Sequence, residues 1–262
     1  MNNSVAEYYQ KNLISGFEDI IIVEKETKAS FEELKKLAPN FPKAWHELSQ
    51  LDLSDKIEFS SLFFSKTIPY LPHIYPKVLD FFSNLEDLSV IMSKKPKLPN
   101  YDVELVYSMM NDSTFFRGRP PLDSFSISLV NRQFNESLPH DFLSFLKIHN
   151  GFAKNNDSGV IEAENIYDVT NNMLDLIEDQ KKIVTCNNQI IDPKDLIFFY
   201  QSYQKVDFQC FYNRWVSNSD IGNVYYSYSD STISNFHDKA TENMAFATFL
   251  DWLVFYLEMV EF

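Results

Sequence analysis

The chain has 262 residues, enough for one large domain or two modest ones, and 45% of its residues are hydrophobic, including 24 Phe and 14 Tyr. This composition indicates a folded protein with an aromatic core. The formal net charge of −14 argues against nucleic acid as a partner, because phosphate binding needs clustered Lys and Arg, and suits a basic protein partner instead.

The N-terminal segment, MNNSVAEYYQ, has neither the basic nor the apolar region of a secretory signal. The most apolar long segment, residues 245–260, contains Asp251 and Glu258 and is too short to span a bilayer comfortably. Cys186 and Cys210 form no CxxC pattern and fit two ordinary thiols in a reducing compartment. We therefore expect a cytoplasmic protein with no membrane partner.

The first hundred residues are predicted to be mainly helical. Residues 30–33 (SFEE) form a capping-box pattern that opens a helix before Pro39. Pro42 and Ser54 are placed to begin two more helices, and residues 101–110 are interpreted as another. A longer helix is predicted over residues 74–91, with an apolar face that fits a core better than a ligand site: Val78, Phe81, Phe82, Leu85 and Leu88.

A domain boundary is predicted at residues 117–121 (RGRPP), because paired prolines cannot continue a helix. Residues 1–116 would then form an all-helical N-terminal region, with residues 122–262 as a second domain. The second part is the more acidic: residues 1–115 carry 12 − 17 = −5, and residues 116–262 carry 11 − 20 = −9.

Residues 124–129 give conflicting signals at the start of the second domain. Phe125, Ile127 and Leu129 alternate with serines, which favours a strand, whereas the longer spacing of Ile127, Val130 and Phe134 favours a helix. We interpret this segment as a helix. Asn135, after it, tolerates a left-handed backbone.

Residues 137–152 (SLPHDFLSFLKIHNGF) predict a short amphipathic helix that starts after Leu138. Pro139 suits a first helical position, and Asp141 places negative charge in the first turn. The positions i, i+3, i+4 and i+7 form one apolar face, and the left-handed C′ residue of the pair Asn150-Gly151 ends the helix. That apolar face comprises Phe142, Phe145, Leu146 and His149.

The remaining elements give an α+β fold with helices at both ends of an antiparallel sheet. Residues 159–164 can form a strand, and residues 166–182 a helix. Three strands rich in β-branched and aromatic residues follow, over residues 196–200, 206–212 and 223–228. A closing helix is predicted over residues 245–258.

Leu-Pro followed by aromatic-x-x-aromatic-Leu and Asn-Gly resembles the signature of the SUKH superfamily, the SMI1/KNR4 family. The resemblance covers residues 122–262 and includes the opening helix, the three strands and the closing helix. It implies an SMI1/KNR4-like antiparallel sheet with flanking helices. It also implies protein binding, because such proteins include bacterial immunity proteins that neutralise toxins, many of them basic nucleases, and fungal regulators of cell-wall synthesis.

Catalytic, cofactor and metal sites are not predicted. The five histidines form no HExxH pattern, and the neighbours His237 and Asp238 cannot face each other on a helix or a strand. His149 fits a core or cap histidine better than a ligand. The sequence has no GxSxG, P-loop or GxGxxG motif, and residues 155–159 lack the spacing of a calcium loop.

An acidic cluster is the candidate partner-binding surface: Asp157, Glu162, Glu164, Asp168, Asp175, Glu178 and Asp179. Such a cluster is also consistent with an ordinary solvated face. Its functional interpretation is that it steers a basic protein partner, such as the toxin that the resemblance implies. We expect a non-catalytic immunity-type protein, with a regulatory scaffold as the alternative and an unrecognised enzyme as a third class.

Overall fold

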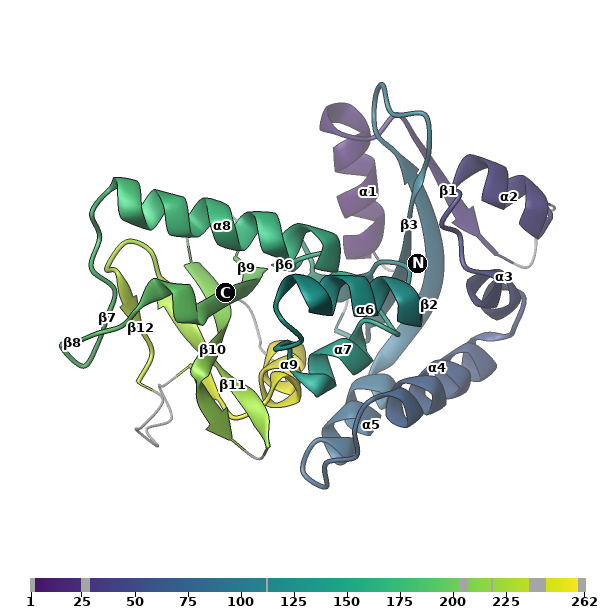
Figure 1. The fold of residues 1–262 in the computed structure, drawn as a ribbon. Helices are drawn as coiled ribbons and strands as arrows, with labels where there is room; N and C mark the ends of the chain where they lie inside the picture. Colours follow the sequence, from purple (N-terminus) through teal and green to yellow (C-terminus); the bar gives the residue numbers. More distant parts are fainter. Residues whose placement is uncertain are drawn as a thin grey trace. The chain divides into compact units, whose positions relative to one another are not determined.

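The computed structural model describes residues 3–24, 29–111, 113–202, 207–217, 219–235 and 244–258 (Figure 1). The chain forms two compact units. The first unit contains Met1–Pro121 and Ile148–Asn156, and the second contains Leu122–Lys147 and Asp157–Phe262. His237 and Asp238, considered above as a pair, lie outside the described residues.

The first unit has an antiparallel sheet in the order β1-β2-β3-β4-β5. The helices are α1 (Asn3–Ser15), α2 (Phe31–Leu37), α3 (Lys43–Ser49), α4 (Leu53–Thr67) and α5 (Tyr75–Ser83). The strands are β1 (Asp19–Val23), β2 (Leu85–Lys94), β3 (Asp102–Met109), β4 (Phe115–Gly118) and β5 (Phe152–Lys154).

Helices cover both faces of this sheet. Successive strand residues point to opposite sides, so each strand has side chains that pack on both faces. On one face, Tyr9 of α1 packs in a buried cluster with Val106 of β3. On the other face, Phe81 of α5 contacts Tyr107 and Phe116, with ring centroids 5.7 and 5.4 Å apart. The strands are therefore buried on both sides.

The prediction of an all-helical N-terminal region is wrong, because this region also contains β1, β2 and β3; β2 and β3 (Asp102–Met109) occupy segments predicted as helices, the end of 74–91 and 101–110. Leu85 and Leu88 continue the helical spacing of α5, but α5 ends at Ser83 and residues 88–93 are all buried. A strand covered on both faces gives a continuous apolar run, which periodicity cannot distinguish from a buried helix. The capping box is confirmed: Ser30 and Glu33 cap each other at the start of α2.

The second unit has strands in the order β6-β9-β10-β11-β12-β7-β8, with β13 paired to β11. All these pairings are antiparallel except β12 with β7. The strands are β6 (Gly159–Val160), β7 (Thr185–Cys186), β8 (Gln189–Ile190), β9 (Leu196–Gln201), β10 (Asp207–Ser217), β11 (Asp220–Ser227), β12 (Thr232–Ile233) and β13 (Ala245–Phe246).

The helices of the second unit are α6 (Ser124–Gln133), α7 (His140–Phe145), α8 (Ala163–Asp179) and α9 (Phe249–Glu258), with a 3-10 turn η1 (Pro193–Asp195). The α+β class is confirmed. Residues 124–129 are helical, with Asp123 as N-cap accepting from the Ser126 N–H. The predicted closing helix is shorter than expected, because residues 245–246 form β13 and α9 begins at Phe249.

An aromatic cluster forms the core beside α7. Phe142, Phe145 and Leu146 are all fully buried, as predicted. The Phe142 ring lies 5.2 Å from Phe211 of β10 and 5.1 Å from Phe249 of α9. The apolar face of α7 thus joins a strand to the closing helix.

The end of α7 differs from the prediction. The helix stops at Phe145, with Pro139 as N-cap and Leu146 as C-cap, so Asn150-Gly151 is not its C-terminal cap. Gly151 does have the predicted left-handed backbone, with φ of 100°, but it leads into β5. Residues 146–148 form a turn that follows the six-residue helix on the way to β5. Independent folding of residues 122–262 stays a prediction.

Candidate functional site

A cleft of about 460 Å³ opens in the second unit beside α8. Its walls come from the end of α6, the connection to α7, α8, η1 and the strands β9 to β11. Polar side chains that include Asn171, Lys194 and Asn213 share the lining with aromatic and aliphatic ones such as Phe134, Tyr167 and Leu196. The cleft therefore offers hydrogen-bonding groups beside apolar surface, as binding sites commonly do.

The connection between α6 and α7 shapes one rim of the cleft. Asn135 and Glu136 both have left-handed backbones, with φ of 53° and 61°, so the chain turns sharply after α6. The Asn131 side chain accepts from the Leu138 N–H at 3.1 Å and holds this turn. Phe134 is thereby placed against Tyr167 of α8, edge to face, with ring centroids 5.8 Å apart.

An unpaired amide lies among the lining residues. Asn213 stands in the part of β10 where the pairing register with β11 shifts, between Phe211 and Val216. Its Oδ1 is buried and has no hydrogen-bond partner within the described residues. A buried acceptor left unpaired costs about 1–3 kcal/mol. Asn213 lines the cleft, but its Oδ1 is itself buried, so the unpaired oxygen lies behind the open surface of the cleft.

The lining of the cleft holds few charged groups. Among the described residues that line it, none is a histidine, a cysteine or a carboxylate, Lys194 is the charged member, and Ser137, Tyr167 and Thr170 carry hydroxyls. No cluster of three or more metal-ligating side chains is found in the described part of the chain.

The acidic residues of α8 form a stripe beside the cleft (Figure 1 shows α8). We define the α8 acidic stripe as Glu164, Asp168, Asp175, Glu178 and Asp179, all of them exposed. At 100° per residue these positions fall within about 100° of the helix circumference. Tyr167 and Leu174, on the adjoining flank of the same helix, line the cleft together with Asn171, which lies within the arc of the stripe. Helix α8 therefore carries the acidic stripe and also contributes residues to the lining of the cleft.

Two residues of the predicted acidic surface lie elsewhere. The Asp157 carboxylate accepts from the hydroxyls of Tyr200 and Tyr256, at 2.8 and 2.7 Å. Burial, and then the Asp157 charge, raises the pKa of Tyr200. Asp157 therefore links β9 to α9 internally. Glu162 is half-buried at the N-cap of α8, where its side chain forms no capping bond.

His149 is an interior residue of the first unit. Its Nδ1 lies 3.1 Å from the Arg119 carbonyl, which can only accept, so Nδ1 carries the proton and Nε2 accepts from the Tyr107 hydroxyl at 2.7 Å. A Cβ at Gly118 would lie 2.2 Å from the imidazole, so only glycine fits there. Burial lowers the pKa of His149 to about 4. The ring is neutral and structural.

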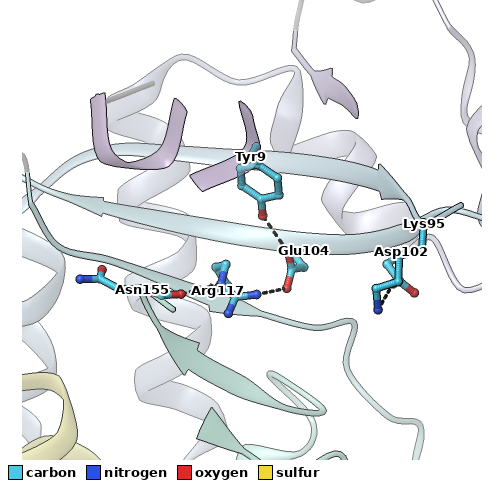
Figure 2. Close-up of polar contacts among 6 residues, drawn as sticks. All are labelled: Tyr9, Lys95, Asp102, Glu104, Arg117 and Asn155. Atoms are coloured by element: carbon cyan, nitrogen blue, oxygen red, sulfur yellow. Dashed lines mark hydrogen bonds and ion pairs between the residues drawn. The ribbon is translucent and has the colours of Figure 1, made fainter. Parts of the chain in front are cut away.

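Arg117 closes a polar network that the sequence did not reveal. Figure 2 shows the Glu104 carboxylate between Tyr9 and Arg117. Tyr9 Oη donates to Glu104 at 2.7 Å, and Arg117 Nη1 lies 2.8 Å from the other carboxylate oxygen. Arg117 Nε donates to the Asn155 carbonyl at 3.2 Å. The network joins α1, β3, β4 and the segment after β5, which are far apart in sequence.

Asp141 and Asp220 form a carboxylate pair at the start of α7. Asp141 accepts from the Phe142 and Leu250 N–H groups, at 2.8 and 2.9 Å, and so caps α9 as well as its own helix. Asp220 accepts from the His140 N–H at 3.3 Å. Burial, and then the Asp220 charge, raises the pKa of Asp141. Because each carboxylate binds backbone at a helix start, the pair is explained by the fold.

The structural motif residues lie in the interior. Leu138, Phe142, Phe145, Leu146 and Asn150 are buried, and so are Pro139 and Gly151. No helix in the described ranges is long and apolar enough to cross a membrane.

Comparison with protein-family models finds one match: residues 121–254, just over half of the chain, match the model described as SMI1 / KNR4 family (SUKH-1). Comparison with curated proteins and with solved structures finds no match.

Proposed function

The chain belongs to the SMI1/KNR4 family (SUKH-1), and we propose on that basis that it is a non-catalytic module that binds a basic protein partner. The observation that carries the proposal is the α8 acidic stripe beside a cleft lined by polar and apolar side chains. A basic surface is attracted by the carboxylates, because complementary charge accelerates encounter and selects the partner.

The cleft offers a specific binding position for a side chain of the attracted partner. An arginine or lysine side chain entering it can pack on the rings of Tyr167 and Phe134, which line the cleft. Cations are attracted to aromatic faces, and a long side chain buries its methylene groups at the same time. Lys194 is exposed, so it can turn away into water.

We propose immunity against a cognate toxin as the specific role, since the family resemblance includes immunity proteins and a basic toxin would fit an acidic surface. A regulatory scaffold is the second candidate. The observation that favours it is the first unit, whose own buried core gives the chain a separate folded part for another partner. A toxin gene directly upstream would support immunity, and its absence beside a constitutively expressed copy would support regulation.

The test begins with affinity purification from the native host and identification of the protein that copurifies. The triple variant Glu164→Lys/Asp168→Lys/Asp175→Lys then reverses three of the five charges of the stripe, all at exposed positions. Association with the copurified partner should slow by about tenfold or more and lose most of its salt dependence, because the three lysines offset the carboxylates that remain, Glu178 and Asp179.

A matched control reverses three exposed carboxylates of the first unit: Glu32→Lys/Asp80→Lys/Glu86→Lys. It changes the net charge equally but leaves the stripe intact, so association should stay near the original rate. Equal slowing in both variants would mean that total charge, and not this surface, governs binding. A separate Tyr167→Ala variant tests the cleft through the dissociation rate, which should increase because an exposed lining ring is removed.

A further inference from the structure

Helix α4 of the first unit is apolar on two opposite sides. Its inner side packs Phe64 against Phe82 of α5, with ring centroids 5.7 Å apart. Its outer side exposes Phe59, Leu62 and Phe63, whose exposed fractions are 65%, 50% and 52%. A surface helix normally carries one apolar stripe, and a contiguous exposed one marks an interaction surface.

The outer side of α4 has a symmetric pattern of residue types. Asp55, Phe59, Leu62 and Lys66 are all exposed and are separated by four, three and four positions. At 100° per residue they lie within about 60° of one another. The spacing is the same in both directions along the helix, with apolar residues in the middle and opposite charges at the ends.

We propose that this outer side of α4 binds a second copy of the chain, with the two α4 helices antiparallel about a two-fold axis. That axis passes between positions 60 and 61. It places Phe59 of each copy opposite Leu62 of the other, and Asp55 opposite Lys66 at both ends. A two-fold interface requires a self-complementary surface, and this pattern provides one.

The two charged residues support a second copy over an unrelated partner. Neither Asp55 nor Lys66 forms an ion pair within the described residues. Only antiparallel self-pairing puts the acidic end of one helix against the basic end of an identical helix. A parallel pairing would place like charges together, which is unfavourable.

The surface area sets the expected strength of the dimer. From the exposed fractions and typical side-chain areas, the three apolar side chains offer roughly 300 Å² per copy. A standard interface buries about 800 Å² per partner, so α4 alone gives a weak, reversible dimer with a Kd on the order of micromolar.

The first experiment measures mass against concentration for the full chain by sedimentation equilibrium, from about 1 to 500 μM, a range that brackets this Kd. We expect a monomer–dimer equilibrium. Phe59→Asp/Leu62→Asp should give a monomer throughout. The matched control Phe125→Asp/Leu129→Asp alters an equally exposed apolar pair on α6 and should dimerise normally. A monomeric original chain, or a dimer that both variants retain, would overturn the proposal.

The second experiment exchanges the charges and does not remove apolar surface, so it decides the question even if the first variant folds poorly. Asp55→Lys and Lys66→Asp should each weaken the dimer about tenfold, because each puts like charges together at both ends. The double variant restores opposite charges across the axis, and its Kd should return to within about twofold of the original. A double variant as weak as the singles would refute the antiparallel register.

Discussion

His149 should make the first unit sensitive to mild acid. Its pKa falls from an ordinary 6.5 to about 4 because the imidazole is fully buried. Above pH 6.5 the ring is neutral in both folded and unfolded chains, and no stability is lost. As the pH falls from 6.5 towards 4, the unfolded chain takes up the proton and the folded chain does not, so the free energy of unfolding decreases.

The size of the loss follows from the pKa difference. With 1.36 kcal/mol per pKa unit, lowering the pH from about 7.5 to 4.5 removes about 2.5 kcal/mol of stability through this group. The raised pKa of Asp141 acts in the opposite direction, because a carboxyl that binds its proton more tightly when folded gains stability as the pH falls. The pH dependence of the total unfolding free energy therefore cannot isolate the contribution of His149, and a variant is needed.

The informative variant is His149→Gln, whose amide can donate to the Arg119 carbonyl and accept from Tyr107 but does not titrate. Urea unfolding of both proteins at a series of pH values gives the difference in unfolding free energy at each pH, in which the other titrations cancel. The difference should favour the original chain at pH 7.5 and shift towards the variant by about 2.5 kcal/mol by pH 4.5.

His140→Gln is the matched control, because it makes the same substitution at an exposed position. A pH-independent difference for His149→Gln would refute the reasoning, since it would mean that the buried ring is protonated as easily as a free histidine.

Three further predictions concern stability, measured by urea unfolding. Gly151→Val should destabilise by more than about 1 kcal/mol, because its φ of 100° strains a β-branched residue; a change within a degree in Tm would contradict this. Phe142→Ala should cost about 3–5 kcal/mol by opening a cavity beside Phe211, whereas Phe125→Ala at an exposed site should cost far less. Arg117→Met should cost about 3–5 kcal/mol by leaving the buried Glu104 charge unpaired, and adding Glu104→Gln should recover most of it. Equal losses in the single and double variants would show that the charge is not the cause.

The sequence predicts local structure well where apolar residues recur on one face of a helix or strand. The burial of Phe142, Phe145 and Leu146 and the left-handed backbone of Gly151 both follow from spacing and residue type. The strands β2 and β3 were missed because a strand buried on both faces has no alternation, and Leu85 and Leu88 extend the helical pattern of α5 by coincidence.

The site was predictable only in part, because its members meet through tertiary structure. The exposed carboxylates of α8 are visible in the sequence as a run. The internal role of Asp157 is not visible in the sequence, because its hydrogen-bond partners Tyr200 and Tyr256 are 43 and 99 positions away. The cleft likewise combines Phe134, Tyr167 and Asn213, and no local signal connects them. Asn213 also lies where the register of β10 with β11 shifts, and registers are not readable from one strand.

The return of the chain to the first unit at Ile148–Asn156 limits how this protein could have been assembled from parts. The matched family region begins at residue 121, yet it supplies β5, which pairs with β4 of the preceding region. If the family region were joined to a different N-terminal sequence at position 121, His149 would lose its hydrogen bond with Tyr107. Phe152 would lose its stacking contact with Phe116. Residues 148–156 therefore belong to the matched family region by sequence and to the first unit by structure.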